Sequence, residues 1–393
     1  MTIPSRELFP SDAPLPLERM IGRREDVDQL VLQLSGGAHR VVAAPRRTGK
    51  SSVCEAAIGL LAAKGFYTVS VSLFKYTDSA TLAEAIARET LANRRPLQKL
   101  IERVRDASVA TLKGAALTVA AKAQADLGDA VEFAIRPGLA ASDPQRALRA
   151  ALELPQRIAE HDGKRLILFI DELQEIAGEG GYGDPDALMK YMRETLHNSD
   201  RVTALFAGSV EHMMRELFTS RHRAFYGFGG FMELTPIALA QWREGLTERF
   251  AEDGCEVDAE VVERVVELGG LHPRAIMLIA QQTHTVAVEA GLRTIDLGLV
   301  LSGWRSALQA ERARHVDAVE TIRHMGRSGA TALRVVGNLA HGRAPYRGLE
   351  SKAAARALRR LQRTSIVHRA AGSGAWELDD PLLAAYVQEE IAT

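Results

Sequence analysis

The sequence predicts an α/β fold in which crossover helices join the strands of a parallel β-sheet. Short apolar runs rich in β-branched residues alternate with stretches of helical periodicity, as is typical of a parallel sheet. One of these runs leads into a loop of small residues and then into a helical stretch. The composition is that of an ordinary globular protein, since 46% of the 393 residues are hydrophobic and 25% are charged.

Five runs are predicted to form strands, namely 40–44, 67–73, 166–170, 202–207 and 231–234. The long interval between the second and third of these, from about 97 to 160, is Ala-rich and predicted mostly helical. A Gly-rich segment, 178–185, is predicted to be a loop. From 237 to about 314 the pattern is helical only, and beyond 321 helices precede a short hairpin and a last helix.

The loop after the first strand contains Ala44-Pro45-Arg46-Arg47-Thr48-Gly49-Lys50-Ser51. In a P-loop, backbone N–H groups cradle phosphates, a lysine reaches the β- and γ-phosphates, and a hydroxyl holds Mg²⁺. Lys50 and Ser51 fill the last two positions, so the sequence predicts ATP and Mg²⁺ as ligands. The predicted nucleotide contacts are Pro45, Arg46, Arg47, Thr48, Gly49, Lys50, Ser51 and Ser52. Ala44 replaces the usual first glycine, and the alternative is a Gly-containing helix start without a ligand.

Two acids, Asp171 and Glu172, end the third apolar run. Ligands of open α/β sheets lie at the carboxyl ends of the strands. We therefore assign Asp171 to Mg²⁺ and Glu172 to the base that activates water. The alternative is that both acids cap the following helix.

The fourth predicted strand ends at Gly208-Ser209. In this class of sheet that strand lies beside the P-loop strand, so Ser209 is predicted to sense the γ-phosphate. An equally open alternative is that Ser209 is the N-cap of a helix beginning at Glu211, and the two roles are compatible.

Taken together, these motifs resemble those of the archaeal-type ATPases, a family of the STAND class of AAA+-related P-loop ATPases. The family is also related to the archaeal replication-initiator ATPases. The resemblance covers nearly the whole chain. It rests on Ile21-Gly22-Arg23-Arg24-Glu25, Pro45 to Lys50, Asp171-Glu172-Leu173-Gln174, Gly208-Ser209, Gly269-Gly270-Leu271-His272-Pro273-Arg274 and Asp380-Pro381.

The resemblance implies a P-loop NTPase sheet, a helical lid and a C-terminal winged-helix domain. We place the ATPase core at 1–236, the lid at 237–316 and the winged helix at 317–393. The resemblance further implies adenine contacts from Ile21, Gly22 and Arg23, and phosphate contacts from Pro273 or Arg274 in the lid.

Basic residues gather near the C-terminus. Between 321 and 370 there are eleven Lys and Arg residues and one acid, Glu350, although the whole chain has a net charge of −1. Residues 351–364 are predicted to form a helix with Ser351 as its N-cap. At roughly 100° per residue, five cations share one face of this helix and Ala354, Leu358 and Leu361 lie opposite. The five are Lys352, Arg356, Arg359, Arg360 and Arg363.

A preceding helix and a hairpin around 372–374 complete the predicted winged helix, which would place the basic helix in the major groove of double-stranded DNA. The alternative is a winged helix that makes protein contacts or inhibits the ATPase. Three functions are consistent with these features. They are an ATP-hydrolysing switch that controls DNA binding, an ATP-dependent replication or repair factor that self-associates on DNA, and a nucleotide-binding signalling scaffold with protein partners.

The remaining features indicate a cytoplasmic protein. Two cysteines, Cys54 and Cys255, provide neither a disulfide framework nor a metal cluster. The N-terminal residues lack the apolar stretch of a signal peptide. Lys113 and Lys122 interrupt the most apolar long segment, so no membrane association is expected.

Overall fold

The computed structural model describes residues 3–94, 123–127, 130–135, 139–177, 182–370 and 374–390. Much of the predicted helical interval 97–160, part of the predicted loop 178–185 and part of the hairpin turn at 372–374 therefore lie outside the described residues. The chain divides into two compact units, which we describe separately. The sheet unit comprises 25–43 and 53–234, and the second unit comprises 1–24, 44–52 and 235–393.

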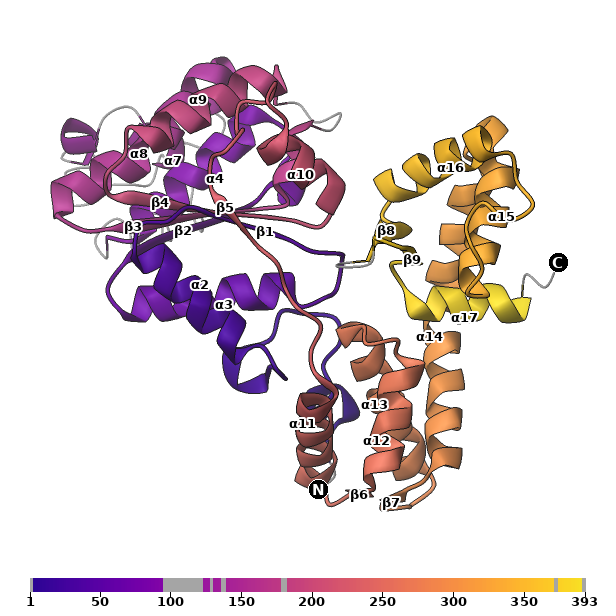
Figure 1. Ribbon diagram of the computed structural model, residues 1–393. Coiled ribbons are helices and arrows are strands. Elements are labelled where there is room, and N and C mark those ends of the chain that lie inside the picture. Colours follow the sequence, from indigo (N-terminus) through magenta and orange to yellow (C-terminus); the bar gives the residue numbers. More distant parts are fainter. Residues whose placement is uncertain are drawn as a thin grey trace. The chain divides into compact units, whose positions relative to one another are not determined.

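A five-stranded parallel sheet forms the centre of the sheet unit (Figure 1), in the order β2-β3-β4-β1-β5. The strands are β1 (Arg40–Ala43), β2 (Tyr67–Ser72), β3 (Leu166–Asp171), β4 (Val202–Gly208) and β5 (Gly230–Met232). The predicted α/β class is thus confirmed, and so is the predicted position of the fourth strand beside the first. Every residue of β4 is buried, as expected for a strand covered on both faces.

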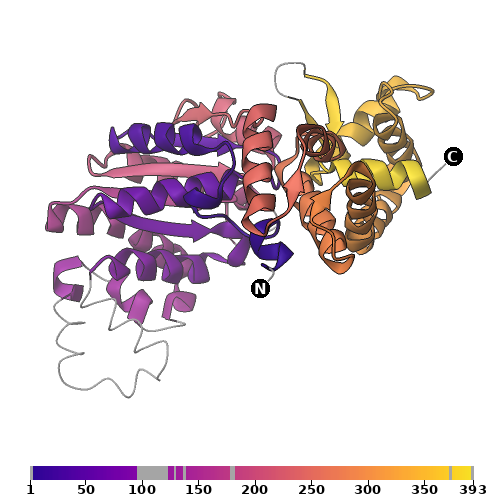
Figure 2. The same cartoon turned by 90° about the horizontal axis from the view of Figure 1, so that it is seen from below.

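Helices cover both faces of this sheet. In Figure 1, α2 (Arg24–Ser35) and α3 (Lys50–Ala63) lie on one face, and α4 (Ser79–Ala92), α8 (Pro144–Asp162) and α9 (Pro185–His197) lie on the other. Figure 2 shows the strands side by side from a second direction. The shorter elements are η2 (Leu73–Lys75), α7 (Ala130–Ile135), η4 (Leu139–Ser142), η5 (Leu173–Ala177) and α10 (Glu211–Thr219).

The second unit begins with α1 (Ser5–Leu8) and η1 (Leu17–Arg19) and continues through a helical region. Its elements are α11 (Leu239–Glu252), β6 (Glu256–Val257), α12 (Ala259–Leu268), α13 (Pro273–Glu289), β7 (Thr294–Ile295) and α14 (Leu297–Arg323). The prediction that this region is helical only was wrong, because β6 and β7 pair in parallel. Each strand has two residues, which is too short to produce an alternating pattern in the sequence.

The C-terminal elements follow the predicted order of helix, helix, hairpin and helix. They are η6 (Gly326–Ser328), α15 (Gly329–Ala340), α16 (Ser351–Arg363), β8 (Val367–Arg369), β9 (Trp376–Leu378) and α17 (Pro381–Glu390). The predicted N-cap Ser351 was wrong. Glu350 occupies that position, and its carboxylate accepts hydrogen bonds from the backbone N–H groups of Lys352 and Ala353. A longer acidic side chain can reach the same orphan donors that a serine would satisfy.

The boundaries predicted between the three domains remain a prediction. α14 is one continuous helix across the predicted boundary at 316/317. Apolar side chains on either side of that boundary nevertheless pack into different clusters: Ala307 and Leu308 pack with α11–α13, whereas Val319 and Ile322 pack with α15 and α16. Within the described residues, no helix combines the length and apolar character that crossing a membrane requires.

Candidate functional site

The predicted phosphate loop follows β1 and leads directly into α3. Arg47 and Gly49 adopt left-handed backbone conformations, with φ of 65° and 92°, and the Thr48 hydroxyl donates to the Pro45 carbonyl oxygen at 2.8 Å. Ala44 keeps a negative φ, so a glycine is not required at this position. Because α3 begins at Lys50, the loop presents the orphan N–H groups of a helix N-terminus, which favour a bound anion.

The entry segment 21–23 lies against this loop. The Arg23 guanidinium donates to the Thr48 carbonyl oxygen at 3.0 Å and to the Thr235 carbonyl oxygen at 2.7 Å. Gly22 has a φ of +64°, and a Cβ there would lie 2.6 Å from Cγ2 of Ile237. Of the predicted entry residues, Arg23 therefore lies against the loop and Gly22 lies against Ile237. Arg23 ties the loop backbone to the segment that precedes α11, while base contacts from Ile21 to Arg23 remain a prediction.

His272 connects the loop to α13, and the sequence prediction missed it. Its Nδ1 accepts from the Ala275 backbone N–H at 3.3 Å, which makes His272 the N-cap of α13. Because Nδ1 accepts, Nε2 carries the proton and donates to the Arg46 carbonyl oxygen at 3.1 Å. Burial lowers the pKa of His272, which favours this neutral ring. The detectable signal was a polar residue directly before a proline at a helix start.

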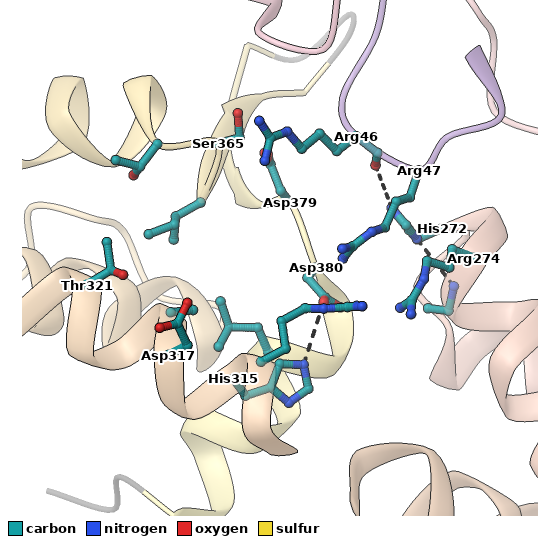
Figure 3. Close-up of a pocket in the computed structure, with 16 residues that line it drawn as sticks. Arg46, Arg47, His272, Arg274, His315, Asp317, Thr321, Ser365, Asp379 and Asp380 are labelled. Carbon is teal, nitrogen blue, oxygen red and sulfur yellow. Dashed lines mark hydrogen bonds and ion pairs between the residues drawn. The ribbon is translucent and has the colours of Figure 1, made fainter. Parts of the chain in front are cut away.

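Arg274, which is predicted to contact phosphate from the lid, forms ion pairs with carboxylates instead. It is 7% exposed, and its guanidinium pairs with Glu311 at 2.9 and 3.1 Å and with Asp12 at 3.0 Å. Arg46, Arg47 and Arg274 line one cavity of about 330 Å³ (Figure 3), together with His315 and Asp380. A phosphate contact from Arg274 therefore stays a prediction, and it would require the arginine to exchange these partners.

In the sheet unit, the two predicted acids lie at the carboxyl end of β3. Asp171 Oδ1 accepts from the Glu172 backbone N–H at 2.9 Å, and Glu172 has a φ of 53°. Glu172 Oε2 accepts from the Ser209 hydroxyl at 2.7 Å and from the Ser209 backbone N–H at 3.3 Å. Three predicted residues thus converge on adjacent strand ends. The N-cap alternative for Ser209 was wrong, because Val210 occupies that position before α10.

Glu55 on α3 adds a further acid that the sequence prediction missed. Burial and the nearby Asp171 carboxylate raise the pKa of Glu55. Such repulsion between acids marks a region of negative potential that suits a divalent cation. The only sequence signal was its position one helical turn beyond Ser51.

The five predicted DNA-contacting cations are all exposed on α16, and the apolar residues of the opposite face are buried. Arg360 also donates to the Met325 carbonyl oxygen at 2.7 Å, so part of its guanidinium is held by the C-terminal region itself. On the hairpin, the guanidinium of Arg369 lies 4.1 Å from the ring centre of Trp376, a cation–π contact.

The sheet order and the strand–loop–helix unit define the α/β fold of the P-loop NTPases. Among solved structures, the chain is similar to the Walker-type ATPase PABY2304 of Pyrococcus abyssi, with 16% identity, a TM-score of 0.63 and coverage of 97% of this chain and 99% of that one. It is also similar to the ORC2 protein of Aeropyrum pernix in its ADPNP–ADP complexes, with 13% identity, a TM-score of 0.56 and full coverage of both chains.

A third similar structure is Cdc6p of Pyrobaculum aerophilum, with 13% identity, a TM-score of 0.50 and full coverage of both chains. At these identities the likeness establishes the fold. No protein-family model matches the chain, and a search of curated proteins finds no match.

Proposed function

We propose that this protein is an ATP-binding and ATP-hydrolysing switch whose nucleotide state controls a basic winged-helix domain. The observation that carries the nucleotide assignment is the phosphate loop between β1 and α3 in a sheet whose neighbouring strands end in Asp171, Glu172 and Ser209. The Walker-type ATPase fold of the similar solved structures supports hydrolysis as the activity.

In this proposal the residues divide the chemistry among them. The loop N–H groups and Lys50 would bind the phosphates, and the Ser51 hydroxyl and the Asp171 carboxylate would hold Mg²⁺. Hydroxyl and carboxylate oxygens are the donors that Mg²⁺ prefers, and the like-charge repulsion between Glu55 and Asp171 is consistent with a cation site there. Bound Mg²⁺ would neutralise developing phosphate charge.

Glu172 takes a proton from the attacking water, and Ser209 positions the Glu172 carboxylate. In the general base mechanism, the protonated carboxyl group then returns its proton to solvent or to the product phosphate. The hydrogen bonds from the Ser209 hydroxyl and backbone N–H to Oε2 support this positioning role.

The exposed cations of α16 support double-stranded DNA as the partner of the C-terminal domain. A narrower candidate is a replication or repair factor that self-associates on DNA, which the fold likeness to proteins named ORC2 and Cdc6p favours. A scaffold that signals through protein contacts would share the nucleotide site but would show neither steady hydrolysis nor DNA binding.

The central test is Lys50→Ala. We expect tight ATP–Mg²⁺ binding to be lost, because the loop would lack the lysine that reaches the β- and γ-phosphates in a P-loop. Isothermal titration measures the affinity, and Lys64→Ala, at an exposed lysine just after the same helix, is the control. Unchanged affinity in Lys50→Ala would overturn the nucleotide assignment.

A further inference from the structure

Gln174 is a buried polar residue for which the function proposed above provides no role. It lies in η5, three residues after the end of β3, and is 2% exposed. Its amide Nε2 donates to Oε2 of Glu172 and lies 3.4 Å from the Ser209 hydroxyl. Glu172 Oε2 therefore receives hydrogen bonds from Gln174 and from both donors of Ser209.

The strand β4 ends at Gly208. Because glycine has no side chain, the amide of Gln174 can occupy the space beside it. A Cβ on Gly208 would lie 2.5 Å from Gln174 Oε1 and 2.5 Å from the Met214 side chain, closer than real Cβ contacts come. Any residue larger than glycine would therefore force the Gln174 amide and the Met214 side chain to shift. The backbone of Gly208 does not itself require glycine, because its φ lies outside the left-handed region. The close packing of Gln174 and Met214 therefore explains why glycine stands here.

The two ends of the Gln174 amide differ in their hydrogen bonding, because Nε2 donates to Glu172 whereas Oε1 accepts nothing from the described residues. Oε1 of Gln174 is buried and has no hydrogen-bond partner in the part of the chain that the structure describes. A buried acceptor without a partner lowers stability, and a methionine or leucine filling the same space would avoid that loss. The reverse amide orientation would set Oε1 against the Glu172 carboxylate, where two acceptors repel each other.

We propose that Gln174 is a positioning residue for ATP hydrolysis: its amide N–H group, together with Ser209, holds the Glu172 carboxylate in the orientation from which it receives the proton of the attacking water. Gln174 does not touch the reacting atoms, and it acts only through Glu172. The inference rests on the proposed function, because it assigns a role within the same hydrolytic site.

A positioning role and a packing role make different predictions for Gln174→Met. Methionine has nearly the same shape but no N–H group, so it keeps the packing and removes the donor. We expect Gln174→Met and Gln174→Ala to reduce kcat by about 10- to 100-fold, as is usual for residues that orient a catalytic group. The dissociation constant for ATP–Mg²⁺, measured by titration, should stay within about twofold, since the P-loop is unchanged.

Gln156→Met is the matched control. Gln156 lies on α8 in the same unit, and its Nε2 also donates to carboxylates, those of Glu160 and Asp200. Its Oε1 is likewise buried without a partner among the described residues. This variant should retain the wild-type kcat. A wild-type kcat in Gln174→Met would assign Gln174 to packing and overturn the proposal.

Gly208→Ala tests the same geometry without altering any polar group. The added methyl group should displace the amide and lower kcat to a similar extent as Gln174→Ala. Combined with Gln174→Ala, it should have little further effect, because the amide that it displaces is already absent. Fully additive losses would contradict the proposal. If the wild-type protein neither binds nor hydrolyses ATP, the proposed function itself is refuted. That outcome is distinguishable from a failure of this proposal, which concerns only the kcat of the variants relative to the wild type.

Discussion

At the scale of single residues, backbone strain marks the candidate site. Among the residues that the structure describes, four non-glycine residues have left-handed backbone conformations, namely Arg47, Glu172, Leu271 and Ser365. Each such residue costs about 1–3 kcal/mol and persists only where the surrounding structure requires it. Arg47 lies in the phosphate loop, Leu271 directly precedes His272, and Ser365 lines the same cavity as Arg47. Glu172 is the proposed base, so its strained backbone is consistent with a constrained catalytic position.

The first prediction at this scale concerns Glu172→Gln. The substitution keeps the shape and removes the basic oxygen, so we expect turnover to fall by roughly 10²-fold or more while ATP binding persists. Phosphate release in single-turnover conditions measures the rate, and titration measures binding. Glu175→Gln, two residues further along η5 from Leu173, is the control. A wild-type rate in Glu172→Gln would mean that another residue acts as the base.

The residues of the site were predictable from sequence to different degrees. Asp171 and Glu172 follow an apolar strand, and Lys50 and Ser51 belong to a recognisable loop, so local patterns are enough to propose them as site residues. His272 and Gln174 contact residues distant in sequence, namely Arg46 and Ser209. A single sequence does not contain those contacts until the strand order and the lid packing are known. For the same reason, the carboxylates that occupy Arg274 were not foreseen.

At the scale of elements, the start of α17 depends on Asp380. Its Oδ1 accepts from the Leu382 backbone N–H at 2.9 Å, and its Oδ2 lies 3.6 Å from the buried imidazole of His315 on α14. Burial alone would raise the pKa of Asp380, but His315, His272 and the Leu382 N–H together lower it to about 2. The ionised carboxylate is therefore more stable in the folded chain than in the unfolded one.

Because the pKa of Asp380 is lower in the folded chain than in the unfolded chain, the free energy of unfolding should decrease at acidic pH. With an unfolded pKa near 3.9, ionised Asp380 contributes roughly 2 kcal/mol above that pH, and the contribution is lost as the pH falls through about 2. Asparagine retains the capping oxygen. Asp380→Asn should therefore lower the free energy of unfolding at pH 5 by that amount and have little effect at pH 2. Denaturant unfolding at both pH values is the measurement.

The control for this prediction is Asp258→Asn, at an exposed aspartate before α12. It should change the free energy of unfolding by much less at pH 5. A difference between wild type and Asp380→Asn that is equally large at both pH values would show that the carboxylate stabilises α17 through packing and not through its charge.

Elements were predicted best where many residues share one pattern. The five strands of the main sheet and the amphipathic α16 agree with prediction to within about two residues, because a fully apolar run or a one-sided cation face leaves a long signal. β6 and β7 leave none, since tertiary packing alone creates two-residue strands. The cap of α16 was misplaced by one residue because Glu350 is an uncommon N-cap type.

At the scale of the whole molecule, charge is segregated along the chain. The acidic majority of the sequence contrasts with the net charge of +10 that residues 321–370 carry. Such a region attracts a polyanion at long range, and the attraction weakens as salt rises. α14 extends from the apolar cluster that it shares with α11–α13 into the apolar cluster of the C-terminal region. Cutting the chain at 317 would divide this helix, so DNA binding is best measured on the full chain.

The last prediction tests DNA as the partner. We expect the full chain to bind labelled duplex at low salt, with affinity falling steeply as salt rises, because each phosphate contact releases counterions. Replacing Arg356, Arg359 and Arg363 with glutamate should weaken binding and reduce the slope of log K against log salt by about 0.9 for each lost contact. ATP binding should persist in this variant, since these residues lie outside the phosphate loop and the acidic site. Fluorescence anisotropy at several salt concentrations provides the measurement.

Its control must change the net charge equally while sparing α16. Lys164, Lys190 and Arg221 are exposed cations of the sheet unit, and their joint replacement by glutamate produces the same change in charge. If α16 contacts the duplex, this control variant should lose far less affinity than the α16 variant, and its salt slope should stay near that of the wild type. Equal losses in both variants would mean that the binding reflects net charge alone. If the wild type fails to bind at low salt, the α16 face instead has a protein partner or inhibits the ATPase, since the electrostatic attraction to any accessible duplex is strongest there.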